Sequence, residues 1–161
     1  MINSYLETIS LVERLHREVL EVIKADLDRN GIRDLNNVQA LILFKIGDDE
    51  LTVGELTNRG YYLGSNVSYN VKKMVENGYL VQERSLHDRR AIHVRLSPKA
   101  LAVRAKMQAM FERHVAQLGQ GVLKADDFDA ANSVLRRLEQ FWAGNLSYPM
   151  RLPADRVSSA A

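Results

Sequence analysis

Hydrophobic residues recur every three or four positions along the first part of the chain. The recurrence from Leu6 to Leu27 predicts a helix over residues 3–30, with Asn3 or Ser4 as its N-cap and Asn30-Gly31 as its stop. Such a helix is ~39 Å long at 1.5 Å per residue. Because one compact domain of 161 residues does not need so long a helix, its apolar face is expected to continue into a partner chain. Residues 36–46 are apolar nearly all round, which predicts a buried central helix.

Two short helices and a hairpin are predicted next. Thr52 and Glu55 have the spacing of a capping box and begin a third helix that ends near Gly60. After a four-residue turn, residues 65–77 form a fourth helix with one apolar stripe. Residues 79–85 and 91–96 are typical of two β-strands, with the second alternating clearly, and the segment between them is basic.

The remaining chain is predicted to be helical up to a short tail. Ser97-Pro98 begins a fifth helix, Gly119-Gln120-Gly121 ends it, and a sixth helix begins near Asp126. The expected fold class is therefore mainly α with a small β-hairpin wing, in a single domain. A winged helix-turn-helix lobe at residues 36–97 would sit on a helical dimerisation region formed by residues 3–30 and 98–146, and residues 147–161 would be an extended or mobile tail.

Composition narrows the possible functions. The chain has no cysteine, which excludes disulfides, thiolate metal sites and cysteine catalysis. Its four histidines lack the spacing of a metal site, and the motifs of hydrolases, nucleotide-binding enzymes and zinc proteases are missing from the sequence. We therefore expect a cytoplasmic protein that is not an enzyme and needs neither metal nor cofactor.

Charge and polarity point to DNA as a partner. Residues 1–50 carry 6 Lys or Arg against 10 Asp or Glu, whereas residues 51–97 carry 7 against 4. The face of the fourth helix opposite its apolar stripe is polar, includes Asn70, and has no carboxylate before Glu76, so it suits the major groove. The candidates for DNA contact on this helix are Ser65, Asn66, Ser68, Tyr69, Lys72 and Lys73. Those in the hairpin are Arg84, Asp88, Arg89 and Arg90, with Asp88 expected to pair with a neighbouring arginine and brace the tip.

These residues resemble the multiple antibiotic resistance regulator (MarR) family. The resemblance covers nearly the whole chain and is sharpest at Asp88-Arg89-Arg90 and at residues 94–100, where Ser97 and Ala100 replace the threonine and glycine of the family pattern. Residues 75–80 are similar to the end of the family's recognition helix and the start of its wing, and residues 60–68 are similar to its LdtR branch.

The resemblance implies a homodimer that binds a pseudo-palindromic operator, with recognition helices ~34 Å apart. The dimer interface would include Leu6, Ile9, Phe128, Leu135, Leu138 and Trp142. Many relatives bind a small aromatic or phenolic effector, for which the candidate residues are His16, Phe44, Phe111 and His114, although core or interface packing also explains all four. The alternative function is a helical dimeric module whose winged lobe binds protein instead of DNA.

Overall fold

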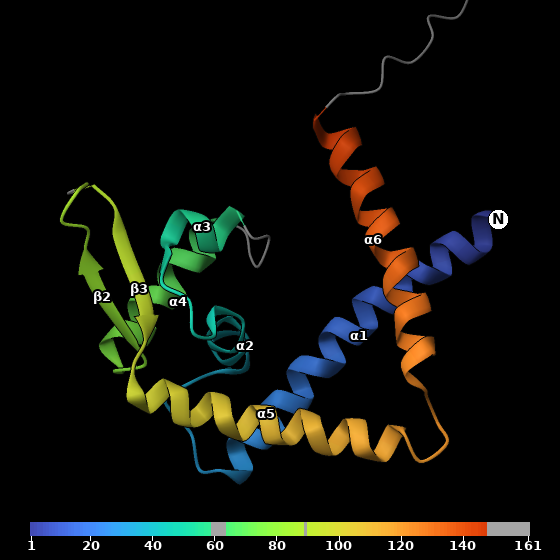
Figure 1. Ribbon diagram of the computed structural model, residues 1–161, viewed down its shortest axis with the longest axis horizontal. Helices are drawn as coiled ribbons and strands as arrows, with labels where there is room; N and C mark the ends of the chain where they lie inside the picture. Colours follow the sequence, from blue (N-terminus) through green and yellow to red (C-terminus); the bar gives the residue numbers. More distant parts are fainter. Residues whose placement is uncertain (59–63, 89, 148–161) are drawn as a thin grey trace, which may run out of the picture. The chain divides into compact units, whose positions relative to one another are not determined.

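The computed structural model describes residues 1–58, 64–88 and 90–147, which divide into two compact units, residues 1–113 and 114–161. The first unit holds eight elements, of which the last runs on into the second unit (Figure 1). In chain order they are α1 (Ile2–Arg29), α2 (Asn37–Ile46), β1 (Leu51–Thr52), α3 (Val53–Asn58), α4 (Gly64–Glu76), β2 (Leu80–Arg84), β3 (Ile92–Leu96) and α5 (Pro98–Leu118).

The winged helix-turn-helix arrangement is confirmed, with one strand more than the sequence pattern predicts. β2 and β3 form the expected antiparallel hairpin, in which Gln82 lies opposite Val94. The two-residue strand β1 pairs with the other edge of β3, with Leu51 opposite Val94, so the sheet order is β1-β3-β2. A two-residue strand is too short to show an alternating pattern, and only its pairing with β3 reveals it.

One hydrophobic core holds the lobe together. α2 contributes Ala40, Ile42, Leu43 and Ile46, all almost inaccessible to solvent, and it contacts α1, α4 and β3. The central position predicted for this helix is therefore confirmed. Val103, Met107 and Met110 of α5 belong to the same core. The long α5 is thus anchored to this core through its first four turns.

The helix ends follow the predicted chemistry at most positions. Asn36 and Gln39 form a capping box at α2, and Thr52 and Glu55 form the predicted one at α3. Ser97 Oγ accepts a hydrogen bond from the Ala100 N–H at the start of α5. The prediction for α1 is wrong, because the helix begins one residue earlier, with Met1 as an N-cap that makes no side-chain hydrogen bond.

The second unit consists of the end of α5 and α6 (Ala125–Ser147). Along α6 nearly every described side chain is exposed, although Phe128, Leu135 and Phe141 are large and apolar. The predicted tail lies outside the described residues from residue 148 onward, as do the turn at residues 61–63 and Arg89. No helix in the described ranges has the length and apolar character that a membrane span requires.

Candidate nucleic-acid interface

The recognition helix α4 is anchored by one buried stripe. Val67, Val71 and Met74 are each 5% exposed or less, and they face α2 and the sheet. Asn70 lies on the same stripe and is 8% exposed, so its assignment to the solvent face is wrong. Its spacing, three residues after Val67 and four before Met74, already places it with the apolar positions.

A buried amide pair joins this helix to α2. Gln39 Nε2 donates to Asn70 Oδ1 over 3.2 Å, and Asn70 Nδ2 donates to the Asn66 carbonyl over 2.9 Å. Gln39 Oε1 also accepts from the Asn36 N–H, which completes the cap of α2. Because buried amides need partners, this pairing selects one rotation of α4 about its own axis, and that rotation decides which side chains face solvent.

The opposite face of α4 is exposed as predicted. Asn66, Ser68, Tyr69 and Lys72 are all solvent-accessible, and Tyr69 has 60% of its surface exposed. Ser65 lies in the first turn of the helix, and its side chain is outside the described part of the structure. These side chains therefore form the exposed polar surface from which base edges can be reached.

Lys73 differs from its neighbour Lys72. Its ammonium group lies 3.1 Å from the Glu76 carboxylate, and this hydrogen bond, together with the charge of Glu76, raises the pKa of Lys73. The partnership neutralises one of the two lysine charges that the sequence assigns to DNA. Lys72 is the more effective cation on this face, because Lys73 must leave Glu76 before it can bind a phosphate.

The wing carries its cations on a braced loop. Arg84 ends β2, and Arg90 follows the loop; both are exposed. Ser85 Oγ accepts from the N–H groups of His87 and Asp88, and Asp88 Oδ1 accepts from the Arg90 N–H over 2.9 Å. The described partner of Asp88 is therefore the main chain of Arg90, and the expected pairing of Asp88 with an arginine side chain stays a prediction, since Arg89 lies outside the described residues.

The recognition helix and the wing border one continuous surface. A hollow of about 390 Å³ is lined by Ser68 and Lys72 of α4, Gln82 of β2, and Val53. A second hollow of about 380 Å³ is lined by Asp88 and Arg90 of the wing, and again by Val53. Val53 therefore lies where the two meet, and the predicted helix and wing residues flank it. Gln82 was missed by sequence reasoning, because only the register of β2 turns it toward α4.

A polar clasp holds the end of α4 against the rest of the lobe. Tyr79 Oη donates to Asp34, Lys99 Nζ donates to the other oxygen of Asp34 over 2.7 Å, and Asn77 Nδ2 donates to the Asp34 carbonyl over 2.9 Å. The Lys99 ammonium also lies 4.2 Å from the centroid of the Tyr79 ring. These bonds tie the α1–α2 loop, the start of the wing and the first turn of α5 together.

The clasp shifts the pKa values of two of its members, Asp34 and Tyr79. The hydrogen bonds from Lys99 and Tyr79 hold the pKa of the Asp34 carboxyl below its ordinary value. Burial, reinforced by the Asp34 carboxylate, raises the pKa of the Tyr79 phenol well above its ordinary value. Tyr79 therefore stays protonated and Asp34 ionised at neutral pH, which keeps the donors and the acceptor matched.

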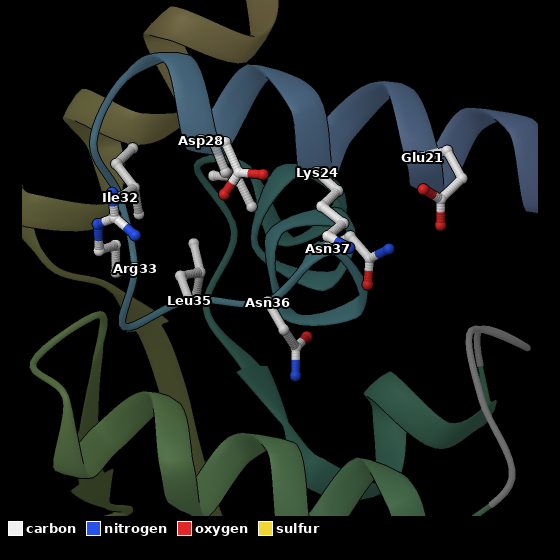
Figure 2. A pocket seen from close by; sticks show the side chains of 9 residues that line it. Glu21, Lys24, Asp28, Ile32, Arg33, Leu35, Asn36 and Asn37 are labelled. Atoms are coloured by element: carbon white, nitrogen blue, oxygen red, sulfur yellow. The ribbon is translucent and has the colours of Figure 1, made fainter.

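Figure 2 shows a cavity between α1 and the start of α2, with a volume of about 400 Å³. Glu21, Lys24 and Asp28 line it from α1, Arg33 lines it from the α1–α2 loop, and Asn37 lines it from the first residue of α2. The lining is charged and lacks aromatic side chains, unlike the predicted effector site.

The effector residues predicted from the sequence lie elsewhere. The rings of Phe44 and Phe111 meet edge to face, with centroids 5.2 Å apart, and pack against the core. His16 is exposed on α1, and His114 belongs to the second unit. These four residues stay a prediction, as no cavity described above includes them. The described His, Asp and Glu side chains form no group of three suited to a metal ion.

Apolar side chains remain exposed outside the lobe. Leu6 of α1 is 52% exposed, and Phe128 and Leu135 of α6 are 43% and 39% exposed. Ile9, Leu138 and Trp142 are partly exposed. Leu11 and Leu15 of α1 are also exposed, on a different face of the helix from Leu6.

The sequence of the chain matches one family model and one known transcriptional activator. Residues 33–91 match the model of the MarR family. The exopolysaccharide II synthesis transcriptional activator ExpG of Rhizobium meliloti (strain 1021) is 32% identical over 145 residues, which cover 90% of this chain and 75% of ExpG.

Two solved structures share the fold. BldR, a transcriptional regulator of Sulfolobus solfataricus, is 20% identical with a TM-score of 0.68, over 84% of this chain and 97% of BldR. FabT of Streptococcus pneumoniae, solved in complex with DNA, is 18% identical with a TM-score of 0.69, over 87% of this chain and 98% of FabT. Together with the winged lobe, the family model and the sequence identity to ExpG show that this chain belongs to the MarR family of transcription regulators.

Proposed function

We propose that the protein is a sequence-specific DNA-binding transcription regulator that acts as a homodimer on a pseudo-palindromic operator. One observation carries the proposal: the polar face of α4 and the arginine-bearing wing border the same surface around Val53. With α4 in a major groove, the wing reaches the adjacent minor groove. The DNA strand that separates the two grooves then passes over the hollows between them.

The side chains on this surface fall into those that read bases and those that bind the DNA backbone or the minor groove. Asn66, Ser68 and Tyr69 face base edges, where amide and hydroxyl groups read donor and acceptor patterns. Lys72 binds the phosphates of the strand between the grooves, and Arg90 enters the minor groove, whose negative potential favours a guanidinium. The DNA bound by FabT and the transcriptional role named for ExpG support this assignment.

The homodimer follows from the helices outside the lobe. Residues 3–30 and 98–146 form the proposed dimerisation region, and their exposed leucine and phenylalanine side chains favour contact with a second copy of the chain. A twofold dimer presents two α4 helices to successive major grooves, so the operator has matching half-sites.

Selection from a random duplex pool tests the proposal. The protein is expected to enrich duplexes with two related half-sites whose centres are about one helical turn apart. Affinity for the enriched duplex falls steeply with log[salt], with a slope of ~0.9 per phosphate contact. Because the homodimer carries two copies of Lys72, Lys72→Gln lowers that slope by about 2, whereas Lys106→Gln, which replaces an exposed lysine on α5, leaves it unchanged and serves as the matched control.

The alternative, a module that binds protein through its winged lobe, makes the opposite prediction. No duplex would be enriched, and binding to DNA would be weak with no difference between Lys72→Gln and Lys106→Gln. That result would refute DNA recognition by α4 and leave the family assignment untouched.

The proposal includes an aromatic effector near Phe44 and Phe111. The edge-to-face packing of these rings supports an aromatic-binding environment. Benzoate and phenol serve as probes: each is titrated into the protein–duplex complex while fluorescence anisotropy reports release. Release that is lost in Phe111→Leu supports the assignment, and equal release from both proteins refutes it.

A further inference from the structure

Leu86 is the most exposed internal hydrophobic residue in the described part of the chain. It lies in the loop between β2 and β3, and 98% of its surface is accessible. In the described part of the lobe the other exposed large apolar side chain is Tyr69 of α4, which is 60% exposed. Single exposed leucines are common on protein surfaces, so exposure alone assigns no role to this one.

The loop around Leu86 is held in one conformation. Ser85 Oγ accepts hydrogen bonds from the N–H groups of His87 and Asp88, over 3.2 and 3.3 Å, so it bridges across Leu86. The Ser85 N–H donates to the Ala91 carbonyl, and the Ala91 N–H donates to the Asp88 carbonyl, so both sides of the loop are closed. A braced main chain of this kind keeps Leu86 pointed outward with little conformational entropy left to lose on binding.

Charge around Leu86 selects the partner. Arg84 precedes it at the end of β2, and Arg90 follows it with an exposed side chain. His87 beside it is exposed and polar. An apolar tip between cationic side chains complements the minor groove, where the phosphates bind the cations and the floor and base steps accept an apolar wedge.

We propose that Leu86 is a minor-groove wedge, which inserts at a base step of the operator and partly unstacks it. The inference rests on the proposed DNA-binding function and adds a specificity determinant to it. Pyrimidine–purine steps such as TA and CA unstack most easily, so the wing selects such a step without hydrogen bonds to its bases. The wedge thereby adds indirect readout to the direct readout by α4.

The wedge is tested with 2-aminopurine, whose fluorescence rises when it loses its stacking partners. The label is placed in turn at each adenine of the duplex that the protein itself selects. Binding of the wild-type protein is expected to raise the fluorescence at one step in each half-site. Leu86→Ala is expected to abolish that rise in fluorescence. It also weakens binding by about ten-fold, because alanine lacks the isopropyl group whose transfer from water into the groove stabilises the complex. Leu86→Met keeps a large apolar side chain at the tip, so the fluorescence rise and the affinity both stay close to those of the wild type.

The controls separate this inference from the proposed function. Arg33→Ala changes an exposed side chain in the α1–α2 loop, outside both the wing and the proposed dimerisation region, and leaves both signals unchanged. Since Leu86 contacts no core residue, the circular dichroism of Leu86→Ala matches the wild type. If the wild type selects no duplex, the proposed function itself is wrong. If the wild type binds a selected duplex but gives the same 2-aminopurine signal as Leu86→Ala, the role of Leu86 as a wedge is refuted. The proposed recognition of DNA by α4 is unaffected by that result.

Discussion

Replacing Asn70 with leucine tests whether the buried amide pair sets the orientation of the recognition helix. The substitution keeps the volume of the side chain roughly constant but leaves the Gln39 amide, at 6% exposure, without its 3.2 Å acceptor. An unsatisfied buried donor costs ~1–3 kcal/mol, so we expect the free energy of unfolding to fall by about 2 kcal/mol. For a chain of this size that loss lowers Tm by roughly 4–8 °C.

Urea denaturation at one fixed protein concentration measures the loss, because dissociation of a dimer would otherwise shift the midpoint. Gln39→Leu is expected to cost slightly more than Asn70→Leu, since Gln39 also accepts from the Asn36 N–H. With both residues changed to leucine, no polar group of the pair is left unpaired. The double variant is therefore more stable than the sum of the single losses predicts, by ~1–3 kcal/mol.

Asn66→Leu is the matched control, because Asn66 is on the same helix but exposed. It changes stability by no more than about 0.5 kcal/mol. The same variants are assayed for DNA affinity: Asn70→Leu weakens binding because α4 loses its fixed rotation, and the double variant does not recover it. Single losses that add within ~0.5 kcal/mol would show that the two amides are not coupled and would refute the reasoning.

Three further predictions address the wing, the clasp and the dimer. Arg90→Ala lowers DNA affinity by about 1–3 kcal/mol in anisotropy titrations with unchanged circular dichroism, and intact binding would exclude this arginine from the interface. Because the folded state lowers the pKa of Asp34, its contribution to stability is present above the unfolded carboxyl pKa and is lost as pH falls through the folded value. Thermal melts should therefore show that the wild type loses some stability below about pH 4, and that Asp34→Asn does not. The loss is modest because the Asp34 carboxylate is half exposed. Leu135→Asp places a charge in the proposed dimer contact, so sedimentation should show a monomer; an intact dimer would refute that interface.

The sequence determined the order and type of the elements. The spacing of Val67, Val71 and Met74, the capping pair Thr52 and Glu55, and the alternation of β3 each act within a few residues. Short-range patterns of this kind report local geometry directly, because helix and strand periods differ. The resemblance to the MarR family that the sequence shows is likewise carried by local motifs around the wing.

Tertiary structure decided what the polar residues do. Asn70 reads as a surface residue by type, yet Gln39, on another helix, supplies the partner that makes its burial favourable. β1 forms only because β3 presents an open edge to Leu51 and Thr52. Asp34, Tyr79 and Lys99 are far apart in the chain, and their clasp depends on how three elements meet. Such long-range partners leave no periodic trace in the sequence, so only packing of the folded chain could reveal them.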